Sequence, residues 1–200
     1  MPKTFQIPQQ KLYDVVIIGG AVYGSSIAWF LIKNSDFCGN VLVIEKDPSY
    51  EFSSTARTNS CIRQQFSTEI NILISKFGAS YIKDFQSHML EDPRVPKLKL
   101  QSFGYLYLAS TKSFADVLRK NQKIQSELGA KTQFMASDQI KKSYPFYNMD
   151  DIVAGNHNKI DEGYFDGSTM FEWWKKKAKE SGVEYIDNEV CSLNLNKKNI

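Results

Sequence analysis

The sequence predicts an α/β fold in which a βαβ core is interrupted by an inserted α+β segment. Two short continuous apolar runs, residues 15–18 and 41–44, are typical of strands that are buried on both faces of a parallel sheet. Between them, apolar residues of segment 24–33 recur at helical spacing. After a long middle part of mixed elements, a helix followed by a strand returns near residue 183.

The first of these elements form one unit. Gly19-Gly20 closes the first apolar run, and a polar turn with Gly39 separates the helix from the second run. Strand, helix and strand in close succession predict a right-handed βαβ unit.

The middle of the chain predicts a long loop and then alternating helices and strands. Residues 47–61 are rich in Ser and Thr and lack periodicity, and their length is unusual for a plain connection. The expected later elements are a helix capped by Ser67 and ended by Asp92-Pro93, a strand at 103–108, a helix at 114–128 closed by Gly129, a short strand and a short helix within 132–149, a turn-rich segment at 155–167, a helix that Asp166 caps and Gly182 ends, and a strand at 183–186.

Composition indicates a globular protein and excludes several classes of partner. Of the 200 residues, 42% are hydrophobic and 24% charged, which argues against disorder, and a net charge of +3 is too small to indicate a polyanionic partner. The lysines of segment 175–179 are interpreted as a solvated helix face, so no nucleic-acid partner is expected. No apolar stretch reaches the roughly 20 residues that a membrane span needs.

Cysteines and histidines give no metal site or disulfide framework. The three cysteines include no C-x-x-C pair, which favours free thiols in a reducing compartment and a cytoplasmic location. The two histidines, His88 and His157, are isolated in the sequence, so no metal site is expected.

The segment Gly19-Gly20-Ala21-Val22-Tyr23-Gly24 carries the strongest chemical signal. A dinucleotide pyrophosphate needs a tight turn, close backbone approach and the free amides of a helix N-terminus. Gly19 suits the turn and Gly24 suits close packing of helix on strand, whereas Ala21 stands in place of the middle glycine. Glu45 ends the second strand roughly 20 residues after Gly24, where an acid binds the ribose hydroxyls. This order predicts a Rossmann-like core that binds a dinucleotide without a 2′-phosphate.

The fingerprint alone does not separate FAD from NAD, but two later motifs do. Glu45-Lys46 leads into a Ser/Thr loop that ends in Ile62-Arg63, and Asp161-Glu162-Gly163-Tyr164-Phe165-Asp166-Gly167 opens a helix. In these motifs the chain resembles the D-amino-acid-oxidase-like (DAO) family of FAD-dependent oxidoreductases, particularly its sarcosine and dimethylglycine dehydrogenase-like branch. The resemblance runs from about residue 13 to 190, with Gly167 where members often have proline.

The resemblance implies roles for individual residues in binding FAD. It places Gly19, Gly20, Ala21, Gly24, Ser54 and Thr55 at the pyrophosphate, Glu45 and Lys46 at the adenosine ribose, the segment from Thr58 to Ile62 beside the isoalloxazine ring, and the backbone of Val190 at the adenine. Arg63 matches a position that approaches the substrate carboxylate, and Arg57 competes for that role. Residues 56–59 hold no histidine, so covalent attachment through this loop is not expected.

The resemblance also implies domains and an activity. Residues 1–90 would begin the FAD-binding domain, 91–155 would form a substrate or cap segment, and 156–200 would return, incompletely, to the FAD-binding domain. The implied reaction is oxidation of a C–N bond in a small amine or N-methyl amino acid, with hydride transfer to the flavin; no catalytic acid or base is assigned. Family members are longer, so either a missing C-terminal half or a second chain would complete the protein.

Two other hypotheses stay open at this point. A nicotinamide-dependent dehydrogenase would use the same glycine turn, although the Ser/Thr loop through Arg63 would then have no explanation. A non-catalytic dinucleotide-binding fragment or scaffold protein of the same fold would fit an incomplete pocket.

Overall fold

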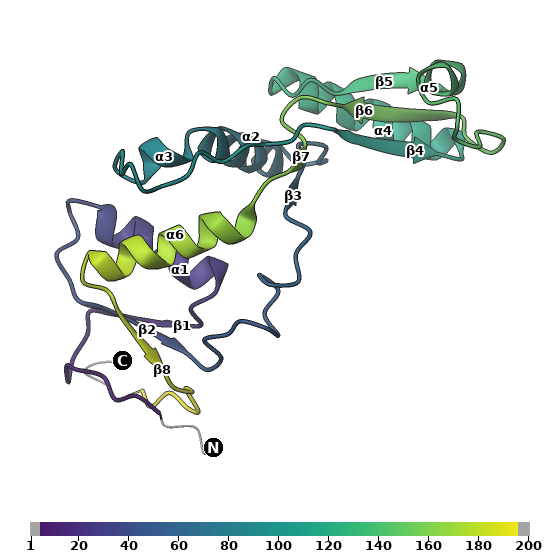
Figure 1. Cartoon of the computed structure of the whole chain (residues 1–200). Helices are drawn as coiled ribbons and strands as arrows, with labels where there is room; N and C mark the ends of the chain where they lie inside the picture. Colours follow the sequence, from purple (N-terminus) through teal and green to yellow (C-terminus); the bar gives the residue numbers. More distant parts are fainter. Residues whose placement is uncertain (1–4, 196–200) are drawn as a thin grey trace. The chain divides into compact units, whose positions relative to one another are not determined.

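The computed structural model describes residues 5–195, which divide into two compact units (Figure 1). The terminal unit combines the described residues up to Thr58 with those from Gly167 onward, and the central unit is Asn59–Asp166. Compactness thus divides the chain at 58/59 and 166/167, whereas the sequence suggested 90/91 and 155/156. The difference arises because segment 59–90 packs within the central unit. The functional roles expected of these segments stay predictions.

The terminal unit is built on a parallel three-stranded sheet with the order β1-β2-β8. Its strands are β1 (Val15–Ile18), β2 (Val41–Glu45) and β8 (Glu184–Asp187), and Val16 lies opposite Leu42 in the register of β1 and β2. Helices α1 (Val22–Lys33) and α6 (Gly167–Glu180) pack side by side (Figure 1). The predicted βαβ unit is confirmed.

Burial within this sheet differs between its strands. In β2, Val41, Leu42 and Val43 are at most 3% exposed, as expected of a strand covered on both faces. In β1, Val16 is 49% and Ile18 57% exposed, so the prediction that both faces of this strand are buried is wrong. The reason is that Val16 and Ile18 lie on the same face of β1, and no part of residues 5–195 covers that face.

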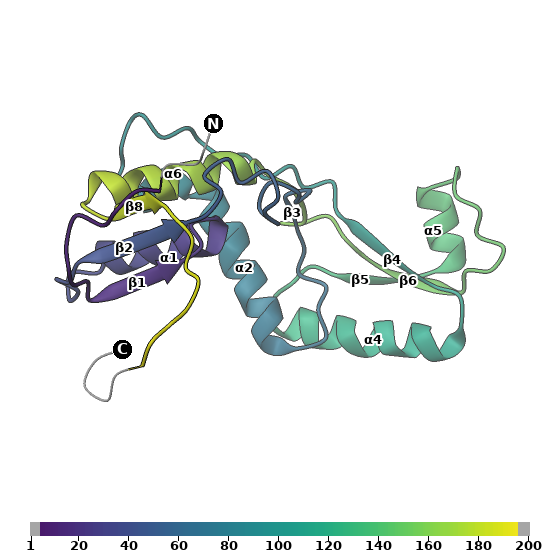
Figure 2. The same cartoon turned by 90° about the horizontal axis from the view of Figure 1, so that it is seen from below.

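The central unit contains an antiparallel three-stranded sheet and a two-stranded ribbon (Figure 2). The sheet has the order β4-β6-β5, and the ribbon pairs β3 with β7. Helix α4 packs along the sheet, and α2 contacts both α4 and β3. The bounds are β3 (Cys61–Ile62), α2 (Glu69–Lys83), α3 (Phe85–His88), β4 (Tyr105–Ala109), α4 (Lys112–Glu127), β5 (Gln133–Ala136), α5 (Ser137–Ser143), β6 (Ala154–Asn158) and β7 (Gly163–Tyr164).

Two expectations about the central unit are wrong. Strand β6 occupies part of the segment predicted to be turn-rich, because β4 and β5 pair with it on both sides although its sequence lacks typical strand residues. Helix α2 begins after Thr68 rather than after Ser67, with no side-chain cap, and it ends at Lys83, well before Asp92.

Within residues 5–195, no helix is long and apolar enough to cross a membrane.

Candidate cofactor and substrate sites

The glycine turn between β1 and α1 has the geometry that a phosphate-binding turn needs. Gly19 has φ = +94°, which favours glycine, and its N–H donates to the Ile44 carbonyl over 2.8 Å. No atom lies within 4 Å of the point where a Cβ on Gly19 would stand, so the turn is open to an approaching group. A Cβ on Gly24 would lie 1.8 Å from the Gly19 oxygen, so only glycine permits this contact of helix and strand.

The N-terminus of α1 carries no acidic side chain in its first turn. Ala21 is the N-cap residue and makes no side-chain cap, while the Val22 N–H donates to the Thr55 hydroxyl oxygen over 3.1 Å. The positive end of the helix dipole favours an anion at this point. Thr55 therefore lies at the opening of the helix, where the sequence predicted a pyrophosphate contact.

Glu45 extends from the end of β2 toward the glycine turn. Its Oε2 accepts a hydrogen bond from the Gly20 N–H and its Oε1 accepts one from the Asp47 N–H, each over 2.8 Å. A carboxylate oxygen has two lone pairs, so each oxygen can accept a further hydrogen bond from a hydroxyl. The acid thus lies beside the turn, with acceptor capacity left over.

Four predicted site residues line one cavity of about 270 Å³ in the terminal unit. The lining residues are Ile18, Gly19, Ile44, Glu45, Lys46, Asn188, Glu189 and Val190. Asn188 and Glu189 were missed by the sequence analysis, although they follow β8 directly and ligands of open parallel sheets bind outside the carboxyl ends of the strands. The Asn188 N–H donates to the Glu45 carbonyl over 3.1 Å, which joins the two strand ends at this cavity.

The other predicted cofactor residues do not line this cavity. Ser54 is exposed, and Thr58 is the last residue of the first of the two segments that form the terminal unit. Ile62 lies in β3 of the central unit. The competing Arg57 is exposed, with its guanidinium carbon 5.5 Å from the centre of the Phe52 ring. Roles for these four residues stay predictions.

Arg63 lies directly after β3 and stacks on aromatic rings of the central unit. Its guanidinium carbon is 4.9 Å from the centre of the Phe66 ring and 5.9 Å from that of Tyr105. Its Nε is buried and has no hydrogen-bond partner. A buried N–H without an acceptor costs free energy, so the Arg63 Nε–H is an unsatisfied donor within the central unit. The pKa of the neighbouring Tyr105 hydroxyl is raised mainly by burial and to a smaller extent by a hydrogen bond with Cys61.

A second charged group, Glu162, is completely buried close to Arg63. Burial raises the pKa of its carboxyl, while hydrogen bonds from its neighbours and the positive charge of Arg63 oppose that shift. Glu162 stands within the motif of residues 161–167, and the sequence predicted no role for it. No local signal marks it, because its partner Gln64 lies 98 positions earlier in the chain.

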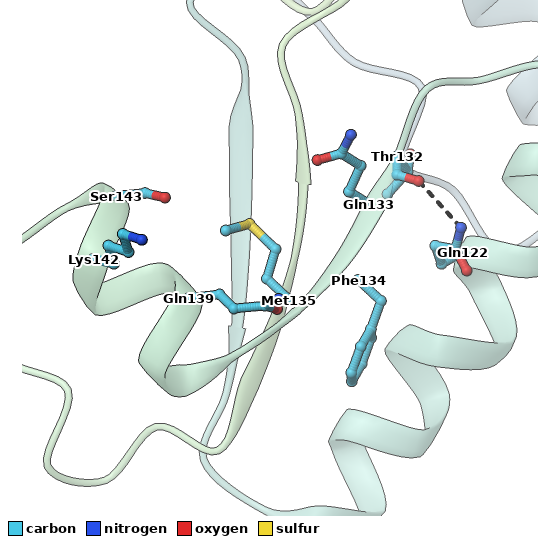
Figure 3. Close-up of a pocket in the computed structure, with 8 residues that line it drawn as sticks. All are labelled: Gln122, Thr132, Gln133, Phe134, Met135, Gln139, Lys142 and Ser143. Carbon is cyan, nitrogen blue, oxygen red and sulfur yellow. Dashed lines mark hydrogen bonds between the residues drawn. The ribbon is translucent and has the colours of Figure 1, made fainter.

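The remaining clusters of the described residues offer less chemistry. Among residues 5–195 no group of three or more His, Cys, Asp or Glu side chains could hold a metal ion. A cavity of about 650 Å³ in the central unit contains none of the predicted residues (Figure 3). Its lining holds amide side chains and Lys142, and Gln122 there donates to the Thr132 carbonyl over 3.1 Å. It lacks an acid or histidine that could transfer a proton.

Comparison with known proteins identifies the family. The family model "FAD dependent oxidoreductase" (DAO) matches residues 14–199. FAD-dependent oxidoreductase domain-containing protein 1 of Xenopus laevis is 34% identical over 199 residues, which are 98% of this chain and 39% of that protein. Sarcosine oxidase subunit beta of Arthrobacter sp. is 28% identical over 186 residues, 90% of this chain and 44% of that protein. The chain thus spans about two fifths of the length of these relatives.

Solved structures share the fold. L-proline dehydrogenase of P. horikoshii superposes with a TM-score of 0.67 at 26% identity, covering 86% of this chain and 42% of that one. Glycine oxidase of Bacillus cereus also gives a TM-score of 0.67, at 18% identity, covering 93% and 49%. Together with the glycine turn, the acid that ends β2 and the match over residues 14–199, these similarities show that the chain belongs to the DAO family of FAD-dependent oxidoreductases.

Proposed function

We propose that the protein to which this chain belongs oxidises the C–N bond of a small amino acid, with a secondary amine such as an N-methyl amino acid as the favoured substrate. The observation that carries the proposal is the Arg63 guanidinium, which is half-buried against the rings of Phe66 and Tyr105, with its Nε–H unpaired. Two of the similar proteins, sarcosine oxidase subunit beta and L-proline dehydrogenase, are named for secondary amines that carry a carboxylate.

The terminal unit would hold FAD, the cofactor of the family. The open space above Gly19 fits the backbone approach of a pyrophosphate, and the cavity between Glu45 and Val190 fits the adenosine side. Lys46, which lines the cavity, would contact the adenosine ribose, and Thr55, at the N-terminus of α1, would contact the pyrophosphate. Bound FAD supplies the acceptor for the hydride equivalent.

Arg63 would bind and orient the substrate. A guanidinium presents N–H groups in a planar fork that matches both oxygens of a carboxylate, and it keeps its charge at all relevant pH values. A half-buried guanidinium is screened less by water than an exposed one, which favours Arg63 over Arg57. Holding the substrate by its carboxylate fixes the position of the carbon that loses hydrogen, which is the main contribution that positioning makes to catalysis.

The test is steady-state oxidation of sarcosine by the whole protein with Arg63 replaced by alanine. We expect Arg63→Ala to raise KM by about 100-fold, because a charge-assisted bidentate pair is lost. Arg119→Ala is the matched control, since Arg119 also stacks on a ring of the central unit, with its guanidinium carbon 3.9 Å from the centre of Phe134. An unchanged KM in Arg63→Ala, or an equal rise in both variants, contradicts the proposed role.

A further inference from the structure

Glu162 is a charged side chain without any exposed surface, located between β6 and β7 of the central unit. Burying a carboxylate is costly unless hydrogen-bond donors satisfy it. Its Oε1 accepts from the Gln64 N–H over 2.7 Å and from Asn158 Nδ2 over 3.0 Å, and its Oε2 accepts from Gln65 Nε2 over 2.9 Å. Three uncharged donors therefore hold this carboxylate in one place.

These hydrogen bonds converge on the segment that carries Arg63. The Gln64 N–H belongs to the peptide bond that directly follows Arg63, so the carboxylate fixes the backbone from which the Arg63 side chain starts. Gln65 Nε2 also donates to the Tyr105 carbonyl over 2.9 Å, which ties the same segment to β4. The Tyr105 ring is one of the two rings on which the guanidinium stacks. One network thus holds both the backbone of Arg63 and a ring that supports it.

The charges of Glu162 and Arg63 attract each other, yet no hydrogen bond joins the two side chains among the described residues. The three uncharged donors all bind the Glu162 oxygens, whereas the Arg63 Nε–H has no acceptor within residues 5–195. We propose that Glu162 is a positioning residue for Arg63: it fixes the backbone from which the Arg63 side chain starts and partly compensates the positive charge of the guanidinium that would bind a substrate carboxylate. The inference deepens the proposed function and rests on it for the identity of the ligand.

A carboxylate at position 162 can accept from all three donors at once, whereas an amide has only one acceptor oxygen. A glutamine there would turn its NH₂ group toward at least one of the donors Gln64 N–H, Gln65 Nε2 and Asn158 Nδ2, so one attractive contact would become a contact of two donors. It would also remove the negative charge near Arg63. Both changes release the Arg63 segment, whereas the side-chain volume stays the same.

The experiment follows the Arg63 Nε–H resonance of the whole chain by ¹H–¹⁵N NMR, with Arg63→Lys identifying the signal by its loss. In the unmodified chain we expect slow exchange of this hydrogen with water, because Nε is buried, and a shift on addition of sarcosine. In Glu162→Gln we expect at least about tenfold faster exchange and at least about tenfold weaker sarcosine binding, because a hydrogen bond to a charged group is lost.

Asn156→Leu is the matched control. Asn156 is 1% exposed on the same strand as Asn158, but its Nδ2 donates to the Leu118 carbonyl over 2.8 Å and not to Glu162. We expect it to lower the stability of the central unit while leaving the exchange of the Arg63 Nε–H and the affinity for sarcosine within about twofold. If Glu162→Gln fails to fold, Gln65→Met replaces it, because that variant removes only one of the three donors.

The outcomes separate the two proposals. The positioning role would be overturned if Glu162→Gln left the exchange of the Arg63 Nε–H unchanged and sarcosine binding unchanged or tighter. It would also be overturned if Asn156→Leu gave the faster exchange and weaker binding that we expect of Glu162→Gln. Faster exchange in Glu162→Gln without any shift of the unmodified chain by sarcosine would support that role and contradict the proposed substrate.

Discussion

Replacing Gly19 by alanine should weaken FAD binding, whereas the same replacement at Gly182 should not. The two glycines have almost the same conformation, φ = +94° and +95°, and neither has an atom within 4 Å of the point where a Cβ would stand. Each substitution therefore adds only backbone strain, which we expect to lower the free energy of unfolding by about 1–2 kcal/mol. Stability alone cannot separate these variants, and this makes them a matched pair.

The difference between the two positions lies in what surrounds them. Gly19 lines the cavity shared by Glu45 and Val190, and an added methyl group would occupy the open space through which a pyrophosphate reaches the backbone. We expect Gly19→Ala to raise the Kd for FAD at least tenfold, which corresponds to about 1.4 kcal/mol. Gly182 follows the end of α6 at Glu180 and lines no cavity that contains a predicted cofactor residue.

The assay is a titration of each variant with FAD, followed by quenching of flavin fluorescence, with urea unfolding measured in parallel. The expected result is a similar loss of stability in both variants and a higher Kd in Gly19→Ala alone. Equal Kd values for the two variants would refute the assignment of this turn to the pyrophosphate.

Three further predictions concern stability. Gly24→Ala should destabilise the terminal unit by about 3 kcal/mol or more, measured by urea unfolding, because the new methyl would lie 1.8 Å from the Gly19 oxygen; a loss below 1 kcal/mol would contradict that contact. Burial raises the pKa of Glu162, so the folded state binds its proton more tightly than the unfolded state does. The free energy of unfolding of the unmodified chain, compared with that of Glu162→Gln, should therefore be greatest at low pH. This difference should decline as the pH rises from 4.5 through the higher folded pKa of Glu162, and unfolding curves at a series of pH values measure it. Burial and the charge of Lys159 lower the pKa of His157. The contribution of neutral His157 to stability should therefore be complete above pH 6.5 and be lost as the pH falls through the folded pKa. An NMR titration that gives His157 a pKa of 6.5 or more would contradict this prediction.

The sequence predicted the elements whose signal is local. The runs that became β1 and β2, the helix between them and the glycines that follow α4 and α6 are all visible as periodicity or as stop signals. Strand β6 is different, because Ala-Gly-Asn-His-Asn carries no strand signal and owes its conformation to the two strands that flank it. The open face of β1 also could not be foreseen, since which segments pack on a face of a sheet is not a local property.

The same distinction applies to the sites. Gly19, Glu45 and Val190 meet at one cavity because each lies at or shortly after the carboxyl end of a parallel strand. The glycine fingerprint marks Gly19 and Glu45, whereas Val190 was implied only by the family resemblance. The sequence indicated no role for Glu162, because that role depends on hydrogen-bond donors that come from a segment 98 positions earlier and from β6. An isolated acid in a sequence does not reveal whether it is exposed or completely buried.

We assign FAD binding to the turn between β1 and α1, together with Glu45. Parallel calorimetric titrations of this chain with FAD and with NAD test this assignment, accompanied by a visible spectrum of the FAD-loaded chain after gel filtration. We predict saturable binding of FAD, a retained flavin absorption band and no comparable binding of NAD. A chain that stays colourless and binds neither nucleotide, or that binds only NAD, would contradict the assignment.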